Sequence, residues 1–359
     1  MYFNILEGKG RDLVVFFSFL SNLKMMILSN LSYTLIPGSL LIVVPAALCG
    51  CSEEIHTPEV QSSNHLTYSN HLIHYHEGED TALDIFAFED DIFRKLDSYQ
   101  RYENLEDGAT AISSTGGNKI FFMCMNTGRK RHEWSEIRSY NSLKSILCNL
   151  ENETAERRAL TGELYGKAGS EYAAAALEPL ACEVELESVG CDFSGTPYAE
   201  YSLEDVRAYL INVSASCPVL FSDEHKPVRY INMGMLNEGE TRNFKDKSIL
   251  VRNISDAIRS ETLRTDAVFL CYPNRPAEDS PGSPRTRLVI EGRIGLQTYY
   301  WPITVNGADG IERGCRYAYD ILIRRKGVTD PDTPVEPANI EINMRIKPWE
   351  EKKGYSVGF

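Results

Sequence analysis

The chain has 359 residues, of which 43% are hydrophobic and 25% charged, enough to bury the cores of about two domains. Its formal charge at pH 7 is −14. A nucleic-acid-binding protein needs a basic surface that displaces counterions from phosphates, so this charge argues against nucleic acid as a partner. The charge also argues against attachment to anionic lipid by electrostatics alone.

The first fifty residues predict an export signal. Three basic side chains, the last of them Lys24, precede an apolar run over residues 40–48. That run has the length of the hydrophobic region of a signal peptide and is too short to span a bilayer. We therefore expect residues 1–50 to be a signal peptide, and initiation near Met25 would give it a more usual length.

The end of this signal predicts a lipid anchor at Cys51. The apolar run ends in Leu48-Cys49-Gly50-Cys51, which is similar to the bacterial lipobox, where a diacylglyceryl group joins the cysteine and the peptide is cut just before it. The Cys-x-Cys spacing is too tight for a closed zinc site, and no second pair lies nearby. The two or three acyl chains of a lipoprotein give stable anchoring, with a plain apolar anchor as the alternative.

The residues after the acceptor cysteine predict a tether. Residues 51–70 are polar and without periodicity. Their first members, Ser52, Glu53 and Glu54, are similar to the serine-plus-acid signals that send lipoproteins of Bacteroidetes to the outer leaflet. We therefore expect a lipid-anchored protein exposed at the cell outer membrane.

Beyond the tether, short β-rich runs alternate with turn-rich segments. In Cys182–Glu187 three acids alternate with apolar residues, the pattern of a strand with one face in water and one on a core. Val206–Leu210 fits a strand or a helix equally well. The other predicted strands are Leu72–His76, Leu83–Phe88, Lys119–Met125, Ala267–Tyr272, Arg287–Ile290, Thr298–Trp301, Tyr317–Ile323 and Ile340–Ile346.

One amphipathic helix is predicted among the strands, because Leu143, Ile146, Leu147 and Leu150 follow the spacing i, i+3, i+4, i+7. Many short strands with few helices are typical of antiparallel β-sandwiches.

A shift in composition near residues 194–197 indicates a domain boundary. We therefore expect a mainly β protein with two sandwich domains, one over residues 71–196 that contains the short helix and one over residues 197–359.

Seven cysteines follow Cys51, and no spacing repeats among them. An odd number without a repeating pattern does not indicate the disulfide framework of a small secreted domain. Most have apolar neighbours, so buried small hydrophobic residues is the better interpretation. One or two disulfides remain open for a protein in an oxidising periplasm. These cysteines are Cys124, Cys148, Cys182, Cys191, Cys217, Cys271 and Cys315.

The motifs provide no catalytic constellation. Gly162–Lys167 is similar to a phosphate-binding loop, but it is one residue short between its glycines and Ala168 replaces the metal-binding hydroxyl. No acid, base and nucleophile are related by spacing, so we expect neither an enzyme nor a cofactor. His74 and His76 would project from one face of a strand as a metal clamp, but a histidine-rich polar segment is the simpler interpretation.

Several stretches together resemble one family. Leu83–Asp90 resembles an early strand of that family, and Leu177–Val184 resembles the entry to the last strand of its first domain. In the second half, Ile311–Tyr317 leads into Asp320–Gly327, and the chain ends in Pro348–Phe359 after an alternating strand. With the lipobox and the tether, this order resembles the fimbrillin-type pilus proteins of Bacteroidales over most of the mature chain.

The resemblance implies two seven-stranded, transthyretin-like sandwiches in a subunit of a fimbria. Such subunits join when an extended strand of one fills a groove in the next, through main-chain hydrogen bonds with alternate side chains as knobs. The implied partners are other fimbrial subunits, the outer membrane through the lipid, and host or bacterial surface ligands for adhesion. The candidate donor residues, which alternate near the C-terminus, are Ile340, Ile342, Met344, Ile346, Tyr355, Val357 and Phe359.

The resemblance also bears on which subunit this is. Stalk subunits of the family are cut by a trypsin-like, arginine-specific protease after the first strand, which opens the groove for an incoming donor. Between Cys51 and Arg94 this chain has no lysine or arginine, so that protease has no site there. A subunit that keeps its first strand but donates its last would sit at the base of the fimbria, so we expect the anchor.

The alternative is a surface lipoprotein that binds glycans with β-sandwich domains. Tyr299, Tyr300 and Trp301 would then stack on sugars. Successive side chains on a strand point to opposite faces, so at least one of these three aromatic residues belongs to a core.

Overall fold

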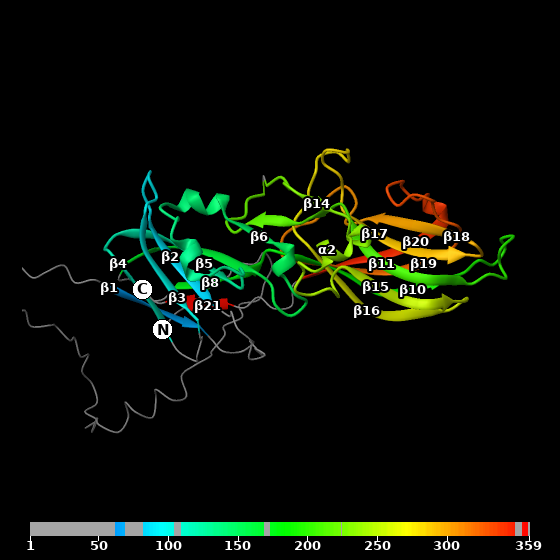
Figure 1. Ribbon diagram of the computed structural model, residues 1–359. Helices are drawn as coiled ribbons and strands as arrows, with labels where there is room; N and C mark the ends of the chain where they lie inside the picture. The colour runs from blue at the N-terminus through cyan, green and yellow to red at the C-terminus, as the bar shows by residue number, and fades with distance from the viewer. Residues whose placement is uncertain are drawn as a thin grey trace, which may run out of the picture. The chain divides into compact units, whose positions relative to one another are not determined.

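A computed structural model describes residues 62–68, 82–103, 109–168, 173–223, 225–348 and 354–357 of the chain (Figure 1). All of these residues fall within one unit, Glu59–Phe359. Strands dominate, which confirms the mainly β class that the sequence predicts. None of the described helices is long and apolar enough to cross a membrane. These helices are η1 (Arg131–Trp134), η2 (Tyr140–Ser145), η3 (Leu150–Asn152), η4 (Met233–Met235) and η5 (Pro337–Asn339), all of 3-10 type, and α2 (Glu238–Thr241).

A five-stranded antiparallel sheet forms the centre of the N-terminal half. Phe86 and Phe122 cover one face of the sheet together with Trp134, whose ring centroid lies 5.2 Å from that of Phe86. Ile85 and Met123 face a second core on the other side. Burial on both faces explains why two of its strands are nearly continuous apolar runs in the sequence. The order is β3 (Leu96–Tyr102), β2 (Leu83–Glu89), β5 (Asn118–Met125), β7 (Leu160–Lys167) and β9 (Glu178–Pro179).

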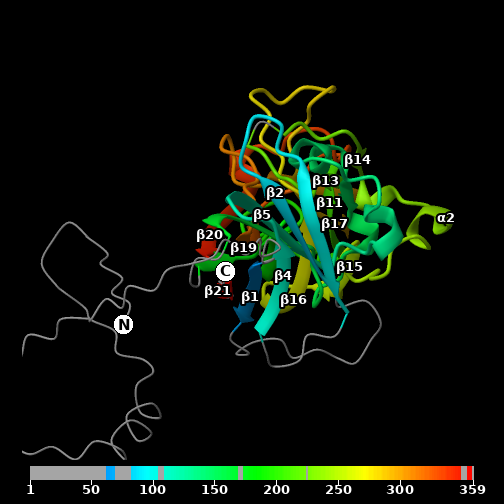
Figure 2. The same cartoon turned by 90° about the vertical axis from the view of Figure 1, so that its left-hand side faces the viewer.

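The second sheet of this half brings together distant parts of the chain, and Figure 2 shows β1 beside β4. Residues 62–68, which we expected within the tether, form a strand because their main chain pairs on both sides. The strand expected at Leu72–His76 lies outside the described residues. The sheet order is β4 (Ala109–Ser114), β1 (Ser62–Tyr68), β21 (Gly354–Val357) and β8 (Ala173–Ala176).

The prediction of an amphipathic helix around Leu143 is wrong. The segment forms η2, then β6 (Leu147–Asn149), then η3. Leu143 and Leu150 are buried as a helical face would require, but Cys148 is buried too, because β6 pairs with β13 (Ser216–Pro218). The Ser142 hydroxyl donates to the Ser139 carbonyl oxygen at 2.5 Å, an example of how serine competes for the backbone bonds of a helix.

Two four-stranded sheets form a sandwich in the C-terminal half (Figure 1). All described strand pairs are antiparallel except β10 with β19. The inward side chains include Tyr209, Trp301 and Tyr319, all nearly inaccessible to solvent. One sheet has the order β16 (Thr262–Cys271), β10 (Cys182–Cys191), β19 (Cys315–Ile323) and β20 (Ile340–Pro348). The other has the order β15 (Val251–Ile258), β11 (Leu203–Ile211), β17 (Arg287–Ile294) and β18 (Gln297–Thr304).

Strand β10 belongs to this C-terminal sandwich, although we expected its first residues to close the first domain. Its hydrogen bonds run to β16 on one side and β19 on the other. The predicted alternation is confirmed on the apolar face, where Cys182, Val184 and Leu186 are buried. The pattern of a strand gives its faces but not its partners, and the domain boundary at residues 196/197 stays a prediction. Two small pairs, β12 (Val213–Ser214) with β14 (Tyr230–Ile231) and β6 with β13, complete the sheets.

Candidate assembly site

The C-terminal strand β21 lies in a slot of the N-terminal half. It pairs antiparallel with β1, where Thr67 is opposite Ser356. On its other side it pairs antiparallel with β8, where Ala174 is opposite Ser356. The slot is therefore a gap between two strands from the first half of the chain, and the strand that fills it comes from the end of the chain.

Strand β20, the other part of the predicted donor region, is tied into its own sandwich. Its nine residues pair with β19 from Ile340 opposite Ile323 to Pro348 opposite Cys315. Ile340 is buried, whereas Ile342 and Ile346 are 41% and 54% exposed along the outer strand of the sheet. The burial of these side chains therefore does not follow the predicted alternation, and the ladder to β19 holds the strand in place.

Ion pairs across the sheet reinforce that ladder. Arg345 of β20 binds Glu187 of β10 and Asp320 of β19, the latter at 2.8 Å. Lys347 binds Glu187 and also Glu185, the latter at 3.2 Å. The hydrogen bond from Lys347 holds the pKa of Glu187 below its usual value. Because these groups are partly exposed, each pair adds little alone, but together they connect β20 to two strands.

The remaining acid of β10, Glu183, was expected to face water like Glu185 and Glu187 and is instead buried. It binds Arg158, which precedes β7, and Arg316 of β19. A buried carboxylate needs such partners because desolvation otherwise disfavours its charge. The ion pair between Arg158 and Glu183 therefore connects a segment of the N-terminal half with the C-terminal sandwich.

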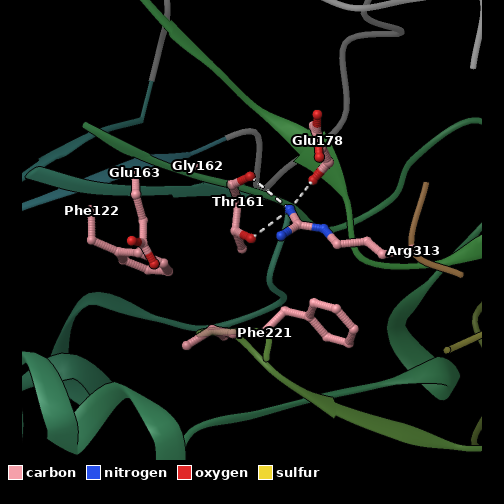
Figure 3. A pocket seen from close by; sticks show the side chains of 8 residues that line it. Phe122, Thr161, Gly162, Glu163, Glu178, Phe221 and Arg313 are labelled. Carbon is pink, nitrogen blue, oxygen red and sulfur yellow. Dashed lines mark hydrogen bonds between the residues drawn. The ribbon is translucent and has the colours of Figure 1, made fainter. Parts of the chain in front are cut away.

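A second connection is made by Arg313, between β18 and β19 (Figure 3). Its guanidinium donates to the carbonyl and hydroxyl oxygens of Thr161 at 2.7 and 2.8 Å and to the carbonyl oxygens of Glu178 and Pro179. The pocket beside it, of about 210 Å³, is also lined by Phe122, Gly162, Glu163, Val219 and Phe221. Because the guanidinium is committed to three carbonyl oxygens and one hydroxyl, its role here is structural.

A third connection centres on the buried carboxyl of Glu153. The Tyr272 hydroxyl donates to one carboxyl oxygen at 2.6 Å, and the Ala159 amide donates to the other at 2.9 Å. Burial raises the pKa of Glu153 to about 7. No sequence pattern distinguished Glu153 or Arg313, because their partners are far away in the chain.

The aromatic run proposed for glycan stacking lies mostly in the core. Trp301 is fully buried, and its indole nitrogen donates to the Arg325 carbonyl oxygen at 3.0 Å. Tyr299 is 7% exposed, and only Tyr300 between them is partly accessible. The run therefore provides no flat aromatic platform at the surface.

The structure leaves several predicted residues untested. Within the part of the chain that it describes, no group of three or more metal-ligating side chains lies together. The predicted residues that lie outside the described residues are Cys51, Ser52, Glu53, Glu54, His74, His76 and Phe359, and only the main chain of Tyr355 and Val357 is described.

The comparisons with known proteins concern the fold. No protein-family model matches the chain. No curated relative matches it. A crystal structure of a fimbrilin from Porphyromonas gingivalis is similar, with a TM-score of 0.54 and 15% identity over 80% of this chain and 96% of that one. The chain has the fimbrillin-type fold.

Two candidate cell adhesion proteins share this fold. The one from Parabacteroides distasonis has a TM-score of 0.57 and 12% identity, over 81% of this chain and 97% of that one. The one from Bacteroides eggerthii has a TM-score of 0.55 and 15% identity, over 76% of this chain and 90% of that one. At such identities the likeness concerns the fold, and the resemblance that the sequence indicates is confirmed at that level.

Proposed function

We propose that this chain is a lipid-anchored subunit of a fimbria at the cell surface, that it joins its neighbour by donating strand β21, and that it serves cell adhesion. The observation that carries the proposal is the pairing of β21 between β1 and β8. A slot that accepts this strand from its own chain presents the same main-chain groups to the same strand from another chain. Exchange of an identical element between protomers is a low-cost route to association.

The geometry favours β21 over β20 as the donor. β21 has four residues, and residues 349–353 separate it from the end of β20. β20 has nine paired residues and ion pairs to two strands. The strand that leaves at the lower cost is the short one, since fewer pairs must open.

The anchor position is supported by the distribution of basic residues. Strand β1 lies between Cys51 and Arg94, where the chain has no lysine or arginine. Arg94 itself follows β2, whose Phe86 and Phe88 are fully buried. A cut after Arg94 would remove β2 from the core, so an arginine-specific protease has no productive site that releases β1 alone.

The test uses one position in β21. In Ser356→Pro the strand loses a main-chain donor in the middle of a sheet, where proline is not tolerated, whereas Ser356→Ala keeps it. Expressed as the sole copy, the proline variant should be acylated and folded but missing from purified fimbriae, and the alanine variant should be present in normal amounts. Normal incorporation of a folded Ser356→Pro variant would contradict donation by β21.

A further inference from the structure

Four buried cysteines lie in two directly opposed pairs. Cys148 of β6 is the register partner of Cys217 of β13. Cys182 of β10 is the register partner of Cys271 of β16. All four are at most 2% exposed, and each is a free thiol in the structure. Directly opposed residues of an antiparallel pair present their side chains on the same face of the sheet.

The separation of the first pair suits a disulfide. The Val219 amide donates to the Ile146 carbonyl oxygen, and the Leu150 amide donates to the Ala215 carbonyl oxygen, two positions to either side of the cysteines. By the alternation of an antiparallel ladder, Cys148 and Cys217 are then a hydrogen-bonded pair with Cα atoms about 5.5 Å apart. Disulfides span Cα separations of about 4.4–6.8 Å.

The second pair lies beside a third thiol. Cys315 begins β19, which runs parallel to β10 on the side away from β16. The Cys182 thiol donates to the carbonyl oxygen of Glu312, in the turn before β19. Cys271 is the partner with a direct antiparallel register, so it is the better placed of the two.

We propose that Cys148–Cys217 and Cys182–Cys271 are two disulfide sites of the exported protein, formed during folding. Each pair of thiols gives up two protons and two electrons to the disulfide of a thiol oxidase or of glutathione, which is reduced to two thiols. The first bond would join the segment that covers the N-terminal sheet to β13 of the C-terminal half. Export to an oxidising compartment rests on the proposed function, but the pairing geometry does not.

Refolding tests the geometry without export. The denatured full chain, which has nine cysteines, is refolded in detergent with a mixture of reduced and oxidised glutathione and alkylated under denaturing conditions. We expect four cysteines to resist alkylation, and non-reducing peptide mapping to recover Cys148 linked to Cys217 and Cys182 linked to Cys271. Each linked peptide should disappear on reduction.

Matched variants sharpen the result. Cys217→Ser should abolish the first linked peptide and keep the second, whereas Cys191→Ser, which removes a cysteine outside both pairs, should keep both. Refolded protein with all thiols free, or with Cys182 linked to Cys315, would overturn the assignment of the pair concerned. The linked peptides do not depend on whether the Ser356→Pro variant assembles into fimbriae. Either proposal can therefore be contradicted without the other.

Discussion

The buried carboxyl of Glu153 makes stability depend on pH. Its pKa is about 7 in the folded protein, raised by burial from a usual value of 4.5. The folded state therefore binds the proton more tightly than the unfolded chain. The stabilisation of the folded state by this proton is complete below about pH 4.5 and is lost as the pH rises through about 7. At about 1.4 kcal/mol per pKa unit, this group should lower the free energy of unfolding by roughly 3 kcal/mol between pH 4 and pH 8.

The measurement is urea denaturation across that range of pH, with Glu153→Gln as the variant. Gln can accept the Ala159 amide and donate to the Tyr272 oxygen, so it should remove this pH dependence and be more stable than the native protein at pH 8. Exposed Glu136→Gln is the matched control and should leave the profile unchanged. If the free energy of unfolding changes with pH equally in the native protein and in Glu153→Gln, the carboxyl is not the titrating group.

A second prediction at the residue scale concerns the lipid. Cys51→Ala removes the acyl acceptor, so the protein should lack lipid and be either soluble or uncleaved in the inner membrane. Labelling cells with an alkyne fatty acid measures this directly, and Cys49→Ala is the matched control that should keep the label. Label retained on Cys51→Ala would contradict the lipobox.

For single residues, the sequence predicted which side chains share a face of a strand, but it did not predict which distant residues they contact. The alternation of Tyr299, Tyr300 and Trp301 required at least one of them in the core, and the structure buries two. The burial of Glu183 could not be predicted, because its partners Arg158 and Arg316 come from other strands or connections. Alternation reports only local geometry, whereas a buried charge depends on contacts far away in the chain.

At the scale of the elements, removal of residues 349–359 should leave a folded protein. The truncation takes away the four residues of β21 and spares β20 with its ladder to β19. The strand is short and lies at the end of the chain, so we expect its loss to lower Tm without abolishing folding; each loss of about 1 kcal/mol shifts Tm by about 2–4 °C for a domain of about 150–250 residues. Thermal unfolding followed by circular dichroism checks this, and a loss of the cooperative transition would show that β21 is essential to its own sandwich.

The strong strand patterns were predictable and the weak ones were not. β5, β10, β19 and β20 fall where apolar runs or alternation placed them. β1 and β8 have no such signal, since main-chain pairing with neighbouring strands holds them in a sheet. Main-chain pairing also explains why the helix predicted at residues 143–150 is not found. The pairing of β6 with β13 outweighed the helical spacing of four apolar side chains.

At the scale of the whole molecule, long-range pairing determines the architecture. Sequence order suggested that β10 closes the first half, but its partners β16 and β19 lie far beyond it. Likewise β21 returns to β1, almost three hundred residues earlier. Class and sandwich type follow from strand density and turn composition, whereas the choice of partner depends on packing that a single sequence does not display.

The central claim is that this subunit keeps its first strand and its lipid at the base of a fimbria. The most direct test is the intact mass of the protein from mature fimbriae, combined with Edman sequencing of its N-terminus. We expect a chain that begins at an acylated Cys51, is blocked to sequencing and carries the mass of its lipid. A mature N-terminus beyond Asp90 with no lipid attached would contradict it.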